Sequence, residues 1–310
     1  MSVGALARRG FGDAARAARL LAEAGLDPVR HEAVMDALSR SADPDLALLG
    51  LVRIVERSPE AEDLFAALHE DADLRERLLR VLGASSALAD HLVRHPGDWR
   101  ELRGADAARL PDAEELRAGL LHVVGADPHS PAPAADLSAF DPAEAAHALR
   151  LAYRRRVLRL AGRDLTGVQD LREVAAELAD LAAAVLEGSL AIARARFPEE
   201  AARCRLAVIG MGKCGGRELN YVSDVDVVFV AEPTADAPDE AAALAAATRL
   251  AAAMMEVPSD TDAEGTLWEV DAALRPDGRH GPLVRPLAGH VAYYERWAKT
   301  WEFQALLKAR

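Results

Sequence analysis

The stretch that decides the fold is "GMGKCGGRELNYVSDVDVVFV", which runs from Gly210 to Val230. Its second half places two aspartates at the start of a β-branched apolar run that is typical of a buried strand. Residues i and i+2 of a strand point to the same face, so Asp224 and Asp226 are expected to project side by side. Two adjacent carboxylates repel each other unless a divalent cation lies between them, and Mg²⁺ prefers such oxygen ligands. The stretch therefore predicts a magnesium site at a strand entrance, with a solvent-facing aspartate pair as the alternative.

The first half of the same stretch has a second interpretation, because its glycines match the G-x-G-x-x-G spacing of dinucleotide-binding sites. Gly210, Gly212 and Gly215 carry the match. Such a site needs a glycine turn that leads directly into a full crossover helix. Only seven residues separate the last glycine, Gly216, from the paired aspartates. Glu232 could contact a ribose, but this interpretation leaves both aspartates unexplained.

A magnesium site for chemistry at phosphorus needs a further carboxylate from a neighbouring strand. Asp271 in "TLWEVDAALRP" is the candidate, and Glu269 on the same strand face is the alternative. The glycine turn before the paired aspartates would let the backbone approach a phosphate group closely. Arg275 and Arg279 are candidates to contact phosphate, and two surface arginines in a turn are the competing interpretation.

The composition is that of a soluble globular chain whose 310 residues suffice for two domains. Its 37 basic and 50 acidic residues give a net charge of −13, which argues against general nucleic-acid binding because such a binder needs a basic surface. Cys204 and Cys214 form no disulfide or zinc pattern, and the N-terminus has no long apolar segment. We therefore expect a cytoplasmic protein with reduced thiols that binds neither nucleic acid nor a membrane.

The composition along the chain predicts an α+β fold in two parts. Residues 1–200 are rich in Ala, Leu, Arg and Glu, which predicts an irregular helical bundle, and prolines interrupt it with a loop near 125–140. Residues 201–310 are expected to form a second domain with a small mixed sheet. Within it, short apolar runs predict strands and longer runs predict helices. The predicted strands are 204–210, 224–232 and 266–276, and the predicted helices are 239–256 and 290–310.

The last 21 residues, "HVAYYERWAKTWEFQALLKAR", are predicted to form one amphipathic helix that carries five aromatic side chains. Trp297 and Trp301 are four positions apart on that helix, which predicts packing in the core or at an interface. No helix-capping signal accompanies the end at Arg310. We therefore expect a fragment of a longer protein, with the second domain truncated at its C-terminus.

The same residues closely resemble those of one enzyme family. The stretch 210–230 resembles the signature of the bacterial bifunctional glutamine synthetase adenylyltransferases/adenylyl-removing enzymes. The resemblance continues through "EVDAALRPDGRHGPL" (269–283) and "YYERWAKTWEFQALLKAR" (293–310), and it covers most of the chain from about residue 80. It implies a nucleotidyltransferase domain of the polymerase-beta type, preceded by a large helical region.

The resemblance also implies a reaction. Members carry two nucleotidyltransferase domains. The N-terminal domain removes AMP from a tyrosine of glutamine synthetase with phosphate and releases ADP, and the C-terminal domain attaches AMP from ATP. The long helical region before the motif implies the N-terminal, adenylyl-removing half. The implied cofactor is Mg²⁺, and the implied partners are glutamine synthetase, ATP/ADP, phosphate and a nitrogen-regulatory signal protein of the PII type.

Carried over by position, the resemblance assigns roles to individual residues. The expected catalytic and metal-binding residues are Asp224, Asp226 and Asp271. The resemblance matches Gly212, Gly215, Gly216 and Ser223 to the phosphate-side loop. Together with Lys213 and Arg275, which the family match does not assign, they are the expected nucleotide- and phosphate-binding residues. The chain departs from the family pattern at Ala272 and Ala273, where many members have an arginine, so no role is assigned there.

Two other functions stay open from the residues alone. One is a nucleotidyltransferase that acts on another target, such as a nucleic acid or an antibiotic; the acidic composition disfavours nucleic acid, and the long helical region is better suited to a protein target. The other is a regulatory fragment that binds nucleotide and magnesium without turnover.

Overall fold

The computed structural model describes residues 1–138 and 141–310. Helix dominates, and a small mixed sheet lies in the second half of the chain. The predicted α+β class is therefore confirmed. The described part of the predicted loop contains no helix, and its last two residues, 139 and 140, lie outside the described residues.

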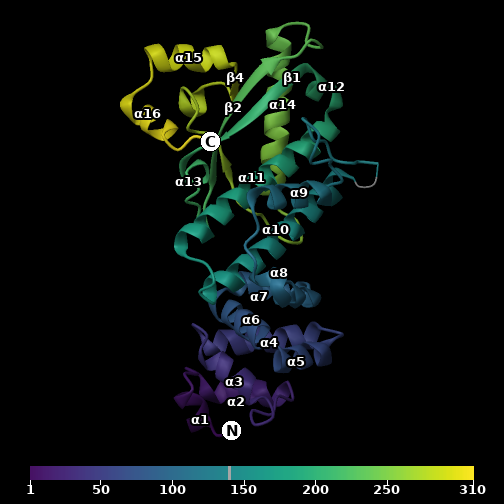
Figure 1. The fold of residues 1–310 in the computed structure, drawn as a ribbon, viewed down its shortest axis with the longest axis vertical. Helices are drawn as coiled ribbons and strands as arrows, with labels where there is room; N and C mark the ends of the chain where they lie inside the picture. Colours follow the sequence, from purple (N-terminus) through teal and green to yellow (C-terminus); the bar gives the residue numbers. More distant parts are fainter. Residues whose placement is uncertain (139–140) are drawn as a thin grey trace. The chain divides into compact units, whose positions relative to one another are not determined.

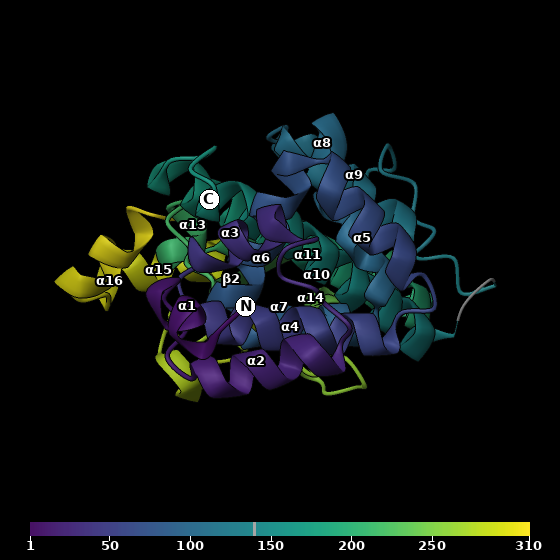
Figure 2. The same ribbon diagram turned by 90° about the horizontal axis from the view of Figure 1, so that it is seen from below.

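The chain divides into two compact units, whose elements are labelled in Figures 1 and 2. The first unit contains residues 1–110 and 154–171, and the second contains residues 111–153 and 172–310. Two long helices have residues in both units, namely α10 (Pro142–Leu165) and α11 (Leu171–Arg196). The predicted division into two domains at residue 200 stays a prediction. In the structure, residues 172–200 belong to the same unit as the sheet.

The first unit is helical throughout. Its complete helices are α1 (Val3–Arg8), α2 (Ala14–Glu23), α3 (Glu32–Ser39), α4 (Pro44–Arg57), α5 (Ala61–Glu70), α6 (Ala72–Ala84), α7 (Ser86–Arg94), the 3₁₀ helix η1 (Pro96–Leu102) and α8 (Gly104–Ala108). The Asp43 carboxylate accepts the Leu46 N–H at 2.9 Å and so caps α4. Helices α4 and α6 pack against each other around buried leucines. This unit supplies none of the expected site residues.

The second unit holds the sheet and every expected site residue. Its helices other than α10 and α11 are α9 (Ala113–Val123), α12 (Pro198–Arg203), α13 (Gly212–Gly215), α14 (Glu240–Ser259), η2 (Gly278–His280), α15 (Leu287–Arg296) and α16 (Thr300–Leu306). Its strands are β1 (Cys204–Gly210), β2 (Val225–Pro233), β3 (Val270–Asp271) and β4 (Val284–Arg285). Strands β1 and β2 confirm the two strands predicted from their apolar runs.

Strand β2 lies at the centre of the sheet. Strand β1 is antiparallel to it, with Gly210 opposite Val227. The short strands β3 and β4 are both parallel to β2 and lie along its other edge. Strand β3 pairs with Val225 and Asp226, and β4 pairs with Phe229 and Val230. Helix α14 packs against β1 and β2 (Figure 1). The entrance of β2 is thereby flanked by β3 on one side and by the glycine turn that follows β1 on the other.

The predicted third strand over 266–276 was wrong in length, because only Val270 and Asp271 form β3. The chain turns immediately afterwards: the Asp271 carboxylate accepts the Ala273 N–H at 2.7 Å. An aspartate side chain that binds backbone two residues on competes with the strand ladder. A longer β3 would also have little room on its edge of β2, since β4 occupies that edge from Phe229 onward.

The predicted single helix over 290–310 is two helices, α15 and α16, with a break before Thr300. Glu302 explains the break: its carboxylate accepts the Lys299 N–H at 2.7 Å and the Tyr293 hydroxyl at 2.7 Å. This capping starts a new helix. Trp297 and Trp301 are exposed, so their predicted packing in the core of this chain was wrong, and an interface role stays a prediction.

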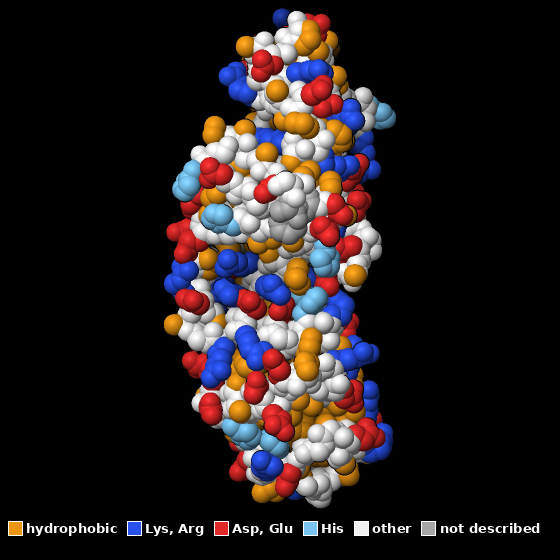
Figure 3. All heavy atoms as spheres, turned by 90° about the vertical axis from the view of Figure 1, so that its right-hand side faces the viewer, with side chains coloured by type: hydrophobic (Ala, Val, Ile, Leu, Met, Phe, Trp, Pro, Cys, Tyr) orange, Lys and Arg blue, Asp and Glu red, His pale blue; other side chains and the backbone are white. Residues whose placement is uncertain are grey.

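Two further properties of the described residues concern charged partners and membranes. Acidic and basic side chains are interspersed over the face drawn in Figure 3. Within the described ranges, no helix combines the length and the apolar character needed to cross a bilayer.

Candidate active site

Three aspartates from two neighbouring strands meet at the entrance of β2. Asp224 immediately precedes β2, Asp226 is its second residue, and Asp271 ends β3. The parallel register places Asp226 directly beside Asp271. One carboxylate oxygen from each of the three lies within 4.8 Å of the other two. The structure thus brings together the three carboxylates that the sequence analysis singled out.

The three carboxylates are electrostatically unfavourable without a cation. Burial is the largest effect that raises the pKa of Asp226, and the negative charges of Asp224 and Asp271 raise it further. The positive charge of Lys213 acts in the opposite direction. A divalent ion placed among the three would remove the repulsion, and carboxylate oxygens suit Mg²⁺. The donor set therefore fits the expected metal.

The glycine turn approaches the aspartates at Gly212. This residue has a φ of 53°, and a Cβ added to it would lie 2.3 Å from Oδ2 of Asp226. The backbone is held there because the Met211 N–H donates to the Asp226 carbonyl at 2.8 Å. Only glycine combines this left-handed conformation with such close contact. Gly212 therefore lets the turn lie directly against the Asp226 carboxylate.

Comparisons with known proteins agree with this geometry. A sequence model of the family described as glutamate-ammonia ligase adenylyltransferase matches residues 75–310. The chain belongs to the glutamate-ammonia ligase adenylyltransferase family. The family expected from the sequence is thereby confirmed, and the match includes the whole sheet and all three aspartates.

Individual members of the glutamate-ammonia ligase adenylyltransferase family show how much of a longer protein is present. A bifunctional glutamine synthetase adenylyltransferase/adenylyl-removing enzyme of Streptomyces avermitilis is 55% identical over 310 residues, which cover 98% of this chain and 29% of the relative. Enzymes of the same name from Cutibacterium acnes and Mycobacterium tuberculosis are each 46% identical over 94% of this chain, and they are covered over 29% and 28% of their lengths. The chain spans less than a third of these curated relatives.

The other glycines of the family signature pack against the protein itself. A Cβ at Gly215 would lie 2.0 Å from the Lys308 carbonyl oxygen and 2.3 Å from that of Gly210. A Cβ at Gly216 would lie 3.0 Å from the Lys308 side chain. These two glycines therefore permit close packing of the turn on residues 308–310, and their expected phosphate contact stays a prediction.

The polar residues of the turn lie on its exposed side. The Lys213 Nζ donates to Oδ1 of Asn220 at 3.2 Å. The Ser223 hydroxyl lies 3.5 Å from Oδ1 of Asp224. Asn220 was not singled out from the sequence, although its place between the glycines and the aspartates was visible there. Asn220 holds the lysine near the carboxylates, and a bound phosphate could replace Asn220 as the acceptor for the Lys213 ammonium.

The two arginines after β3 have different surroundings. Arg275 donates to three backbone carbonyls, those of Ala272 at 2.7 Å, Gly281 at 3.2 Å and Arg279 at 3.4 Å. Its donors hold the turn together, so its expected phosphate contact would compete with these bonds. Arg279 is mostly exposed, and its Nη2 lies 3.6 Å from Oδ2 of Asp271. Of the two, Arg279 is the one with donors available to a ligand.

Glu269, the alternative third carboxylate, does not join the group of three within the described residues. Its side chain is exposed, and its backbone carbonyl accepts the Val225 N–H at 3.0 Å. Its structural contribution is thus to hold β3 beside β2.

A cavity of about 790 Å³ lies next to the carboxylates. Asp271, Arg275 and Arg279 are among the residues that line it, together with Trp268 and Met255. It thus combines charged groups next to the three aspartates with one aromatic side chain. Such a combination suits a nucleotide, which has a charged and an aromatic end.

Proposed function

We propose that this chain is the adenylyl-removing part of a bifunctional enzyme, and that it removes AMP from adenylyl-tyrosine of glutamine synthetase by phosphorolysis. The observation that carries the proposal is the group of three aspartates at the entrance of β2 in a member of the glutamate-ammonia ligase adenylyltransferase family. The relatives are named for both an adenylyltransferase and an adenylyl-removing activity. The protein substrate is inferred from those names.

The direction of the reaction is inferred from the order of elements. Long helices precede the glycine turn and the aspartates, as the N-terminal half of the family is expected to show. The same resemblance supports ATP/ADP and phosphate as ligands and a PII-type signal protein as the regulator. The second nucleotidyltransferase site would belong to the part of the relatives that this chain does not span.

The reaction needs an oxygen of phosphate to attack the AMP phosphorus while the bond from phosphorus to the tyrosyl oxygen breaks. The proton of the attacking phosphate passes to the tyrosyl oxygen, so the products are ADP and an unmodified tyrosine and no further reactant is needed. Asp224, Asp226 and Asp271 would hold Mg²⁺, which when bound neutralises charge at the phosphorus and at the leaving oxygen. Lys213 and Arg279 would orient and neutralise the attacking phosphate.

The cavity next to Asp271 would take the AMP portion of the modified tyrosine. Trp268 offers an aromatic face for the adenine, and Arg279 lies at the side toward the carboxylates. An adenine bound there would bring its own phosphate toward Asp271. The cavity volume of about 790 Å³ suffices for a nucleotide.

The experiment is an assay of ADP formation from adenylylated glutamine synthetase, phosphate and Mg²⁺. The Asp226→Asn variant should lose about 10³-fold in rate, because it removes a metal ligand. Asp236→Asn is the matched control, since Asp236 is exposed in the loop after β2, and it should retain full activity. Equal activity of the Asp226→Asn variant and the unaltered chain would refute the metal assignment.

A further inference from the structure

One edge of β1 has almost no backbone partners. The other edge pairs along its whole length with β2. On the first edge, the described part of the chain supplies partners at Gly210 alone: the Gly210 N–H donates to the Arg310 carbonyl at 2.9 Å, and the Arg310 N–H donates back at 3.0 Å. Two residues that exchange both bonds form the hydrogen-bonded pair of an antiparallel ladder. Arg310 thus lies beside β1 with the backbone pairing that one residue of an antiparallel strand would have.

The alternation of a strand fixes which further residues of β1 face this edge. Because Gly210 directs its N–H and C=O away from β2, Val208 and Leu206 direct theirs the same way. Ala207 and Ile209 direct theirs toward β2, opposite Val230 and Val228. An edge with unpaired N–H and C=O groups is a template for one more strand.

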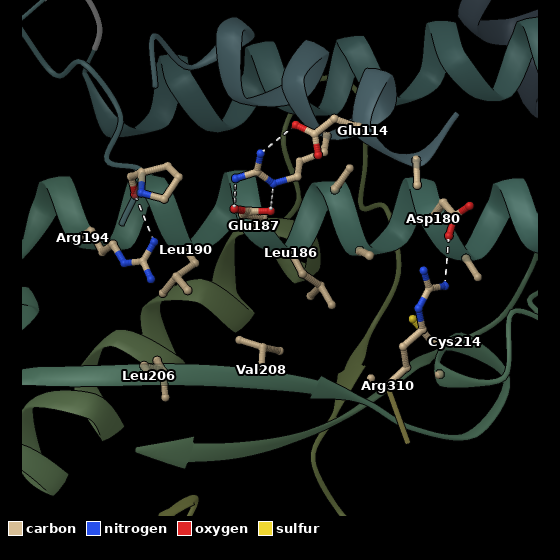
Figure 4. Close-up of a pocket in the computed structure, with 18 of the residues that line it drawn as sticks. Glu114, Asp180, Leu186, Glu187, Leu190, Arg194, Leu206, Val208, Cys214 and Arg310 are labelled. Atoms are coloured by element: carbon tan, nitrogen blue, oxygen red, sulfur yellow. Dashed lines mark hydrogen bonds and ion pairs between the residues drawn. The ribbon is translucent and has the colours of Figure 1, made fainter. Parts of the chain in front are cut away.

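A cavity of about 550 Å³ lies between this edge and α11. Figure 4 shows Leu206 and Val208 of β1 on one side of it and Leu186 and Leu190 of α11 on the other. Arg310 lies at one end, where its guanidinium donates to Asp180 at 3.3 Å. The space therefore runs along β1, starts at Arg310 and has apolar walls.

Charged side chains also line the cavity: Arg194 lies at the end away from Arg310, and Glu187 lies along the middle, between Leu186 and Leu190 of α11 (Figure 4). The Arg194 guanidinium donates to the Pro133 carbonyl at 3.1 Å (Figure 4). The two oxygens of Glu187 each accept from Arg117 at 2.8 Å. Burial lowers the pKa of Arg194. Between Arg194 and Arg310, Leu206 and Val208 of β1 face Leu186 and Leu190 of α11.

We propose that the open edge of β1 and this cavity form a docking site for one further β-strand, and that its occupant is the extended stretch that follows Arg310 in the longer protein. The antiparallel register would place the second residue after Arg310 opposite Val208 and the fourth opposite Leu206. Side chains that enter the cavity would be apolar, since they meet Leu186 and Leu190. This inference rests on the proposed function, in which the chain is the N-terminal part of a longer enzyme and further residues follow Arg310.

The docked strand would support the active site from behind. The segment 308–310 already lies against the glycine turn, since Gly215 leaves no room for a Cβ beside the Lys308 carbonyl. The same turn touches Asp226 through Gly212 on its other side. Fixing the strand along β1 would therefore fix the position of the turn against the metal-binding carboxylate.

Amide hydrogen exchange on two chains tests this proposal without any catalytic assay. One chain ends at Arg310, and the other carries in addition the ten residues that follow the matching position in the Streptomyces avermitilis relative. The Val208 and Leu206 amides should exchange about 100-fold more slowly in the extended chain, because they gain a partner there. The Ala207 and Ile209 amides are internal controls, and they should be protected equally in both chains.

An Ala183→Trp variant of the extended chain adds a second measurement. Ala183 is exposed and lines the cavity, so the indole should obstruct the strand and restore fast exchange at Val208. Ala245→Trp, at an exposed position of α14, is the matched control, and the Val208 amide should stay protected in it. Fast exchange at Val208 and Leu206 in the extended chain would overturn the proposal. So would protection in the shorter chain that rises with protein concentration, because a second copy would then occupy the edge.

Discussion

Asp226 of β2 and Asp271 of β3 are paired in register on adjacent parallel strands, with Asp224 completing a group of three carboxylates. The pairing explains how two residues far apart in the sequence come to share one site. It also explains why β3 matters although it has two residues: its register alone sets the position of Asp271. Stability, metal binding and activity should all depend on this pair.

The first prediction concerns the metal-free protein. The pKa of Asp226 is raised by burial and by the two neighbouring aspartates, so the folded state holds the proton more tightly than the unfolded state does. Stability of the metal-free chain should therefore fall as pH rises through the folded pKa. Asp226→Asn removes this cost and should raise the metal-free Tm at pH 7 by about 1–4 °C.

Differential scanning calorimetry with and without Mg²⁺ measures both sides of that prediction. Mg²⁺ should raise the Tm of the unaltered chain, because it binds the folded state only, and it should leave the Tm of the Asp226→Asn variant unchanged. A lower metal-free Tm in the variant would show that Asp226 stabilises the fold by some contact other than a metal.

The second prediction concerns Gly212. In a Gly212→Ala variant the added Cβ would meet Oδ2 of Asp226 at 2.3 Å, so the carboxylate must move, and activity should fall about 100-fold. Gly167→Ala is the matched control, because Gly167 also has a positive φ, of 73°, but has open space around it. Both variants should lose about 1 kcal/mol of stability. Only Gly212→Ala should weaken Mg²⁺ binding, as measured by calorimetric titration.

The third prediction separates the two arginines after β3. Arg275→Gln should lower the Tm, because it removes bonds to the carbonyls of Ala272 and Gly281, each worth about 1 kcal/mol. Arg279→Gln should leave the Tm unchanged and raise KM for phosphate, since Arg279 is exposed beside Asp271. Phosphate titrations of the two variants at fixed Mg²⁺ make the comparison. An unchanged KM in the Arg279→Gln variant would remove Arg279 from the phosphate site.

The fourth prediction concerns thiol reactivity. Burial raises the pKa of the Cys214 thiol to about 11, so about one molecule in a thousand carries the thiolate at pH 8. Alkylation of Cys214 by iodoacetamide should be slow at pH 8 and should accelerate with each pH unit up to pH 10. Peptide mass spectrometry after timed labelling gives the rate. Rapid labelling at pH 8 would mean that α13 opens readily and exposes the buried Cys214 thiol.

Much of the sheet and the three aspartates that meet at the entrance of β2 could be predicted from the sequence. The strands β1 and β2 are continuous apolar runs, and the spacing of Asp224 and Asp226 follows directly from strand geometry. The third carboxylate could also be proposed, because Asp271 lies in a run of strand-forming residues. These features depend on local patterns only.

Other features depend on contacts that local patterns do not contain. The break between α15 and α16 comes from Glu302, whose bond to Tyr293 lies across the turn. The role of Arg275 depends on carbonyls on both sides of its own turn. The packing of Gly215 against Lys308 joins segments that are distant in the sequence. Spacing within one segment could not have predicted any of these contacts.

The most direct test of the central claim follows labelled phosphate. Adenylylated glutamine synthetase is incubated with this chain, Mg²⁺ and radiolabelled inorganic phosphate, and the nucleotide product and the mass of the modified tyrosine are measured. Phosphorolysis predicts ADP with the label in its β-phosphate and a tyrosine that has lost AMP. Release of unlabelled AMP, or no loss of AMP from the tyrosine, would contradict the account.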